Sequence, residues 1–297
     1  MKKGDELRYL TVTYSIAFED RPEWRKAPAF VFRSVIGLAL RRLTCALRLQ
    51  ESCHDCMVRE SCVYSVFFET NVDKANTSLP GRNRAVHPFV VDIRSLTESS
   101  AVLDITFIGR AVNYIPYLNI ALTNAGEAGI GKNRAKFSVT GIYTGEDEFV
   151  PNLREIERRC SVWPSENVRV PKAITLVTPC RIKEKGKYIS SVTLDSLSLN
   201  MLRRVTALSE LFGDEKDRER YLSISPVSST PQNQKWTEKT YYSSRQKSRM
   251  QFGGVVGEIL IDGEVPPDVC SLVEAMELFH VGKNISFGLG KIKVEYR

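Results

Sequence analysis

The stretch from Met250 to Tyr296 reads MQFGGVVGEILIDGEVPPDVCSLVEAMELFHVGKNISFGLGKIKVEY. Its pattern predicts a strand that begins with glycine, a helix, a loop containing glycine and lysine, and an alternating strand. An earlier stretch, VLDITFIGRAVNYIPYLNIALTNAGEAGIGKNRAKFSV at 102–139, follows the same order. Two copies of one unit favour a duplicated α+β fold whose loops present backbone amides and cations to an anion.

The composition favours a globular protein with a polyanionic partner. At 297 residues and 42% hydrophobic content, the chain is long enough for two domains with their own cores. The net charge of +7 favours nucleic acid but does not by itself separate RNA from DNA or from a membrane surface. The start MKKGDELRYL does not have the pattern of a secretory signal, and no apolar run reaches the roughly 18 residues of a spanning helix. We therefore expect a cytoplasmic protein.

The order of elements predicts two tandem ferredoxin-like (βαββαβ) domains. In the first half we expect strands at 10–18, 87–94, 101–108 and 135–142 and helices at 29–44 and 111–124. In the second half we expect strands at 172–182, 253–261 and 288–296, helices at 196–212 and 267–279, and a hairpin region between them. Prolines at 151, 164 and 171 mark the passage between the halves. The predicted domains are 1–164 and 165–297.

The helix at 29–44 is amphipathic with an unusual polar side. Apolar residues fall on one side of it, and the opposite side gathers Arg33, Ser34, Gly37, Arg41 and Thr44. We expect that side to be exposed and cationic.

Four cysteines crowd into the segment after this helix: Cys45, Cys53, Cys56 and Cys62. The pair Cys53 and Cys56 has the two-residue gap of a metal knuckle, and four thiolates satisfy a tetrahedral structural zinc site. The outer spacings are irregular. An iron–sulfur cluster uses the same ligands, and buried cysteines without a metal are the third interpretation. We favour structural zinc, with no part in the chemistry.

Two segments suit contact with RNA. The loop around Lys283 is rich in glycine, which allows close backbone approach to phosphate, although a tight helix-to-strand turn explains the glycines equally well. The stretch QKWTEKTYYSSRQKSRM at 234–250 mixes cations with aromatic residues and has one acid. This mixture suits single-stranded or distorted RNA, whereas the alternative is a solvated hairpin with a charged edge.

The chain has three histidines. His54 lies inside the cysteine knuckle, where it is a metal ligand or exposed. His87 precedes a proline at the start of a strand, and we interpret it first as structural. His280 ends the last helix and is expected to cap its carbonyl groups.

Together these segments resemble the CRISPR-associated endoribonucleases that cut precursor CRISPR RNA, in the repeat-associated protein superfamily. The resemblance is most specific in YYSSRQKSRMQFGGVVGEI (241–259) joined to LFHVGKNISFGLGKIKV (278–294). It includes FIGRAVNYIPYLNIAL (107–122) with the GIGKNR loop at 129–134, and residues 33–69, which resemble a cysteine-containing subgroup.

The resemblance implies metal-independent cleavage of the CRISPR repeat. The ribose 2′-hydroxyl attacks the adjacent phosphate and leaves a 2′,3′-cyclic phosphate and a 5′-hydroxyl, which needs a base, an acid and cations. Many members carry a histidine on or near the first helix, and this chain has none there. Either His54 or His87 enters from a neighbouring loop, or cleavage relies on lysine, arginine and tyrosine side chains, as in some relatives. The catalytic candidates are His54, His87 and Arg33. The RNA-binding candidates are Arg41, Lys132, Arg134, Lys235, Trp236, Tyr242, Arg245, Gln246, Lys283, Gly288, Gly290 and Lys291.

Two other functions compete with the endoribonuclease. A noncatalytic RNA-binding subunit of a CRISPR effector complex shares the same fold, and the missing first-helix histidine favours it. A zinc-dependent DNA-binding regulator is less favoured because no helix-turn-helix pattern accompanies the cysteines. The resemblance also leaves a homodimer open, and no membrane partner is expected.

Overall fold

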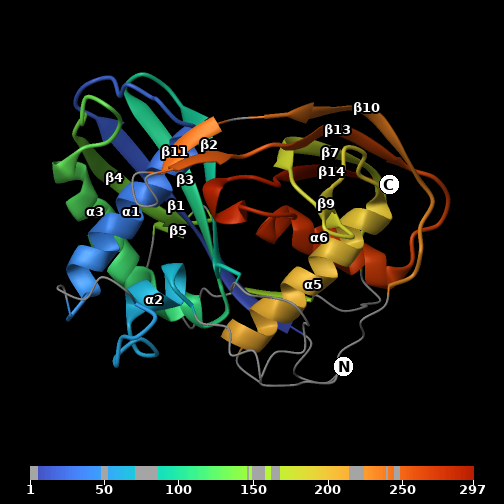
Figure 1. Ribbon diagram of the computed structural model, residues 1–297, viewed down its shortest axis with the longest axis horizontal. Helices are drawn as coiled ribbons and strands as arrows, with labels where there is room; N and C mark the ends of the chain where they lie inside the picture. The colour runs from blue at the N-terminus through green and yellow to red at the C-terminus, as the bar shows by residue number, and fades with distance from the viewer. Residues whose placement is uncertain are drawn as a thin grey trace. The chain divides into compact units, whose positions relative to one another are not determined.

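The computed structural model describes residues 6–47, 53–70, 86–145, 147–148, 158–161, 168–213, 224–238, 240–243 and 248–297. The chain forms two compact units (Figure 1). The amino-terminal unit comprises Arg8–Arg159 and Ala207–Lys216, and the carboxy-terminal unit comprises Met1–Leu7, Cys160–Thr206 and Asp217–Arg297.

The amino-terminal unit is built on an antiparallel sheet in the order β2-β3-β1-β4-β5, and β6 also pairs with β1. Its elements in chain order are β1 (Glu6–Phe18), α1 (Pro28–Thr44), α2 (Val63–Phe68), β2 (Phe89–Leu96), β3 (Ser100–Ile108), a 3-10 turn η1 (Gly109–Tyr114), α3 (Ile115–Ala128), β4 (Phe137–Thr144), β5 (Asp147–Glu148) and β6 (Arg158–Ser161). Helices connect β1 to β2 and β3 to β4, which are not neighbours in the sheet, while β2 and β3 follow each other directly. This is the connectivity of a ferredoxin-like unit.

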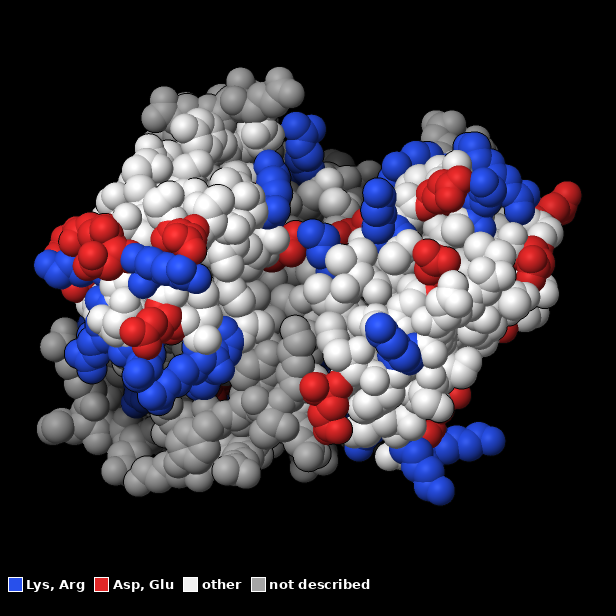
Figure 2. Space-filling view, turned by 90° about the horizontal axis from the view of Figure 1, so that it is seen from above, with Lys and Arg blue, Asp and Glu red and all other residues white. Residues whose placement is uncertain are grey.

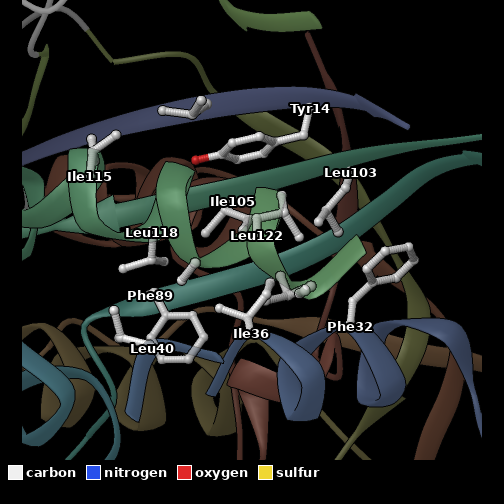
Figure 3. Packing of buried hydrophobic residues seen from close by; sticks show 14 of the residues in the cluster. Tyr14, Phe32, Ile36, Leu40, Phe89, Leu103, Ile105, Ile115, Leu118 and Leu122 are labelled. Atoms are coloured by element: carbon white, nitrogen blue, oxygen red, sulfur yellow. The ribbon is translucent and has the colours of Figure 1, made fainter. Parts of the chain in front are cut away.

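The core of this unit lies between the sheet and the helices α1 and α3. Alternate residues of β1 face inward because side chains alternate along a strand, and Tyr14 among them is fully buried. Its hydroxyl donates to Asn119 Oδ1 of α3 at 2.7 Å, so the buried polar atom is satisfied. Figure 3 shows where the apolar side chains meet: Phe32, Ile36 and Leu40 of α1, Ile115, Leu118 and Leu122 of α3, and Leu103 and Ile105 of β3.

The carboxy-terminal unit repeats the topology with a sheet in the order β10-β13-β7-β14. Its elements are β7 (Pro171–Cys180), β8 (Lys183–Glu184), β9 (Lys187–Tyr188), α5 (Leu194–Phe212, whose last residues belong to the amino-terminal unit), β10 (Ser229–Thr237), β11 (Thr240–Ser243), β12 (Ser248–Gln251), β13 (Gly254–Ile261), α6 (Pro267–Phe279), η2 (Ile285–Phe287) and β14 (Ile292–Tyr296). The pairs β8–β9 and β11–β12 form separate hairpins. The first strand of each unit, β1 or β7, therefore lies between the third and fourth strands of its ferredoxin-like sheet, which are β3 and β4 or β13 and β14.

The glycine–lysine loops show the duplication at the level of single hydrogen bonds. In the amino-terminal unit the amide of Lys132 donates to the carbonyl oxygen of Glu23 at 2.9 Å, and in the carboxy-terminal unit the amide of Lys283 donates to that of Arg181 at 2.9 Å. Both acceptors lie in the segment that follows the first strand of their unit. The two loops therefore close onto equivalent places, as expected for repeated units.

The predicted fold class is confirmed, and one helix differs from its expected form. The helix predicted at 111–124 consists of the 3-10 turn η1 followed by α3, which has a proline in its first turn. Proline lacks the amide hydrogen needed inside a helix and favours the first turn, so Pro116 marks the start of a new helix at Ile115. Within the described part of the chain, no helix is both long and apolar enough to span a membrane.

Candidate active site and RNA interface

The structure brings together two of the three predicted catalytic residues. Arg33 lies on α1 and His87 immediately before β2, and Arg33 Nη2 is 3.4 Å from His87 Nε2. On the other side of the ring, His87 Nδ1 lies 2.9 Å from the carbonyl oxygen of Phe67. A carbonyl oxygen only accepts, so Nδ1 carries the hydrogen, and in the neutral ring Nε2 is an acceptor facing the guanidinium.

The short helix α2 holds this pair in place. Its residue Phe67 provides the carbonyl that fixes the His87 ring, and the ring of the next residue, Phe68, lies 5.1 Å from the Arg33 guanidinium carbon. Such a stack of a guanidinium on an aromatic face is a cation–π contact that orients the planar group. Both members of the pair are half-buried.

The prediction that the cationic side of α1 is exposed is wrong. A Cβ atom at Gly37 would lie 3.0 Å from the Phe68 ring, so the glycine allows α2 to approach closely, and Gly37 is buried. Arg41, one turn further on, has its guanidinium carbon 5.8 Å from the Tyr64 ring and is half-buried. This side of α1 is covered by α2, because its glycine leaves room and its arginines pack their flat groups on rings.

His54 lies in a different environment from His87. Its side chain is 78% exposed, and Nδ1 lies 2.7 Å from the carboxylate of the neighbouring Asp55. Arg59 donates to the backbone carbonyl of His54, which braces the turn. The imidazole of His54 is therefore a solvent-facing group on the cysteine segment.

The four clustered cysteines lie at the ends of two helices. Cys45 directly follows α1, Cys62 directly precedes α2, and Cys53 and Cys56 form a turn between them. All four are half-buried and outside any disulfide. Burial raises the pKa of the Cys53 thiol, and the charges of Glu69, Cys45 and Cys62 act in the same direction while Arg41 opposes them.

Four thiols are suitable ligands for zinc, but in the structure their sulfur atoms do not come together as a metal site. Across the described ranges, no group of three His, Cys, Asp or Glu side chains lies close enough together to hold a metal ion. Zinc binding at the four thiols stays a prediction, and no catalytic role is attached to it.

The glycine loop of the carboxy-terminal unit uses its amides internally. Gly288 donates to the carbonyl of Ile285 at 2.8 Å, Gly290 donates to that of Pro179 at 3.2 Å, and the amide of Lys291 donates to Thr178 Oγ1 at 2.9 Å. These amides therefore do not form the outward-facing anion site that the glycines suggested. At Gly290, φ is +71° and a Cβ would lie 1.8 Å from the carbonyl oxygen of Val281, so the tight turn explains the glycine.

His280 is the C-cap residue of the last helix, α6, and its side chain reaches the loop that follows. It is buried, and its Nδ1 lies 3.2 Å from the carbonyl oxygen of Leu289, to which it donates across the loop. The terminal helix carbonyl of Phe279 instead accepts from Nε of the buried Arg204 of α5 at 3.2 Å. A cation at a helix C-terminus also offsets the negative end of the helix dipole.

The loop of the amino-terminal unit contains two RNA-binding candidates. Lys132 Nζ lies 3.3 Å from a carboxylate oxygen of Glu23, and both side chains are about half exposed. Arg134 is exposed and has a positive φ of 52°. Lys132 has an acidic neighbour that any phosphate would have to replace.

The structure shows an aromatic and cationic cluster that the sequence pattern did not reveal. The Tyr188 ring, on the β8–β9 hairpin, lies 4.1 Å from the Arg181 guanidinium carbon, 4.7 Å from Lys183 Nζ and 6.0 Å from Lys283 Nζ. The ring of Trp236 is 6.3 Å from that of Tyr188. In the sequence, the lysine-rich run KEKGKY at 183–188 is the feature that could have indicated this cluster.

Other RNA-binding candidates are only partly described. Lys235 is exposed on β10, next to Trp236. Tyr242 belongs to β11, of which the backbone alone is described, and Arg245 and Gln246 lie outside the described residues. On the face in Figure 2, Lys and Arg side chains gather in several groups with Asp and Glu among them, so RNA contacts have to be argued from particular residues.

Two family models match the chain. Residues 174–292 match CRISPR-associated endoribonuclease Cas6, and residues 7–163 match AF_1859_N, described as an N-terminal domain. No curated protein matches the sequence.

Solved structures with the same fold span nearly the whole chain. A Cas6 product complex is 12% identical with a TM-score of 0.54, covering 97% of this chain and 99% of that one. Thermus thermophilus Cas6 is 13% identical with a TM-score of 0.51, covering 97% and 99%. A chain of a partial Cas6-RT-Cas1–Cas2 complex is 12% identical with a TM-score of 0.51, covering 98% of this chain and 46% of that one. At these identities the similarity establishes the fold.

Proposed function

We propose that this chain, whose residues 174–292 match the model of CRISPR-associated endoribonuclease Cas6, cuts CRISPR repeat RNA without a catalytic metal ion. The observation that supports this chemistry is the Arg33–His87 pair, with Nη2 and Nε2 3.4 Å apart. The pair combines an imidazole with a permanent cation. Cleavage by a ribose 2′-hydroxyl needs both, a base for the hydroxyl and a positive charge for the phosphate.

His87 is the proposed base. Its Nδ1–H is engaged by the carbonyl of Phe67, which leaves Nε2 as the atom that accepts a proton. The distance from Nε2 to Arg33 is longer than the roughly 2.7–3.2 Å of a strong hydrogen bond, so a 2′-hydroxyl can replace this contact at little cost. The carbonyl of Phe67 also stabilises the imidazolium that forms when Nε2 takes the proton.

Arg33 is the proposed electrostatic group. When the 2′-oxygen gives its proton to Nε2 and bonds to phosphorus, negative charge builds on the phosphoryl oxygens beside the guanidinium. The bond from phosphorus to the 5′-oxygen then breaks, and that oxygen takes up a proton. The products are a 2′,3′-cyclic phosphate and a 5′-hydroxyl.

The test is incubation of the protein with its own repeat RNA in EDTA, followed by analysis of the product ends. We expect one cut per repeat, a 2′,3′-cyclic phosphate, and no cut when the nucleotide before the cleaved bond carries 2′-deoxyribose. Tight binding without cleavage would reject the nuclease and leave an RNA-holding subunit. Cleavage that depends on added divalent metal would reject the proposed chemistry.

We further propose that the four clustered thiols hold a structural zinc ion. Their position supports this, since Cys45 directly follows α1 and Cys62 directly precedes α2. A metal bound there would link the two helices that carry Arg33 and the Phe67 carbonyl. Zinc bound by four thiolates has no open position, so its role would be stability.

We also propose that the protein assembles with other CRISPR proteins. A chain of similar fold occurs in a partial Cas6-RT-Cas1–Cas2 complex. Size-exclusion chromatography with light scattering, with and without repeat RNA, separates a monomer from a homodimer. A pull-down with the neighbouring CRISPR proteins tests for an effector complex.

A further inference from the structure

The β8–β9 hairpin positions the Tyr188 ring. Lys183 pairs with Tyr188 and Glu184 with Lys187, and the two turn residues, Lys185 and Gly186, both have positive φ, 45° and 82°. Positive φ at both central residues is typical of the two-residue turn that matches the twist of a hairpin. The hairpin therefore holds the Tyr188 ring in a defined place.

Trp236 is held beside this ring by a second close contact. A Cβ at Gly253 would lie 2.6 Å from the indole, so the glycine lets the backbone pack directly against Trp236. The two rings are 6.3 Å apart with planes tilted by 51°, and Tyr188 is 39% and Trp236 38% exposed. Each ring thus keeps part of its surface toward solvent while its position is set by packing.

Three cations lie around the Tyr188 ring. Arg181 and Lys183 lie 4.1 and 4.7 Å from the Tyr188 ring centre, and Lys283 reaches it from the glycine loop at 6.0 Å. The backbone of Lys283 is tied to that of Arg181, so the loop and the segment after β7 form one surface. Lys185 and Lys187 add two exposed positive charges to the hairpin, against one acid, Glu184.

We propose that this cluster, Arg181, Lys183, Tyr188, Trp236 and Lys283, binds unpaired nucleotides of the RNA substrate. The inference rests on the proposed function for the identity of the substrate. Exposed ring faces and a stacked guanidinium plane bind bases by stacking, and the lysines pair with the phosphates between them. An acidic peptide would be attracted by the charges alone and would not depend on the two rings. A regular duplex has its bases stacked inside and offers no face to the rings.

The test measures binding separately from cleavage. The probe is repeat RNA with 2′-O-methyl groups throughout, which cannot undergo 2′-oxygen attack, in EDTA. Tyr188→Ala and Trp236→Ala are each expected to weaken binding by about 5- to 150-fold, the effect of losing one stacked base. Tyr188→Phe keeps the ring and should bind as the wild type does. Tyr117→Ala removes a half-exposed ring of the amino-terminal unit and is the matched control.

A second probe separates stacking from charge. Replacing the unpaired nucleotides by abasic ones keeps the phosphates, so it should weaken binding to the wild type and leave binding to the Tyr188→Ala, Trp236→Ala double variant nearly unchanged. Lys183→Ala should lower the salt dependence of log Kd by about 0.7 for one lost phosphate contact on a single strand.

The outcomes separate this inference from the nuclease. Equal affinities of wild type and ring variants, in proteins with unchanged circular dichroism, would overturn the inference whether or not the RNA is cut. Base-dependent binding without any cleavage of unmodified RNA would keep the binding site and reject the nuclease. Equal loss for intact and abasic probes in the ring variants would also overturn it, because the rings would then act only through the fold.

Discussion

His87 Nε2 faces Arg33 Nη2 across 3.4 Å, although 54 residues separate them in the chain. The contact forms because α2 covers α1: Phe68 stacks on the guanidinium, and the carbonyl of Phe67 fixes the imidazole. His87, which precedes β2 in the chain, therefore lies beside the first helix, α1.

Removal of either partner should reduce cleavage while leaving RNA binding largely intact. His87→Ala removes the base and is expected to slow single-turnover cleavage by about 10²- to 10⁴-fold. Arg33→Ala removes the cation and should cost about 10²-fold. Arg42→Ala, at an exposed position of the same helix, is the matched control and should cut at the wild-type rate. If His54→Ala abolished cleavage and His87→Ala did not, the base would be assigned to the wrong histidine.

Stability should fall at alkaline pH through a buried thiol. Burial raises the pKa of Cys180 from 9.0 to about 12, and its thiol donates to the carbonyl of Val281 at a sulfur–oxygen distance of 3.7 Å. Above pH 9 the unfolded chain releases this proton first. The free energy of unfolding therefore decreases between pH 9 and 12, by up to about 1.4 kcal/mol per pH unit from this group.

The contribution of Cys180 is isolated by comparison with Cys180→Ala. Burial raises the pKa of Tyr14 as well, so the wild-type slope alone does not identify the thiol. Urea unfolding at several pH values from 7 to 10.5 should give a shallower decline for the variant, beside a constant offset from the lost sulfur. Parallel curves for the two proteins would contradict the assignment.

Two glycines with positive φ should differ sharply when replaced by alanine. Gly290→Ala brings a Cβ against the carbonyl of Val281, whereas Gly186→Ala has no atom within 4 Å of the new Cβ. We expect Gly290→Ala to lower the free energy of unfolding by about 3–5 kcal/mol, from strain and collision together. Gly186→Ala should cost about 1–2 kcal/mol, the strain term alone. Equal losses in thermal or urea unfolding would mean that the loop relaxes around the new methyl group.

Zinc content tests the cysteine segment. We expect purified protein to carry one zinc per chain by elemental analysis, and Cys53→Ser with Cys56→Ser to lose it and to lower Tm. Cys270→Ser, far from the segment in sequence and buried, controls for loss of a thiol. Iron with sulfide in the protein would favour a cluster, and protein without metal that is as stable as the zinc-loaded form would reject a metal site.

Much of the fold can be predicted from local sequence patterns. The alternation in β1, the apolar side of α1 and the glycine–lysine turns each depend on residues a few positions apart, and these elements were predicted within a few residues. The division of the predicted helix before α3 follows from Pro116, a local signal that the periodic pattern hid. The side of α1 that faces α2 could not be recognised from the sequence, because an arginine that stacks on an aromatic ring and an arginine exposed to water give the same local pattern.

The sequence by itself determined the repeated βαββαβ order, because strand and helix periodicity and turn residues act over short distances along the chain. Only the tertiary structure decided which histidine meets Arg33, which cations surround Tyr188, and that the amides of Gly288 and Gly290 are already paired. The physical reason is that a side chain's partner is set by where distant segments return in space. Local spacing does not carry that information.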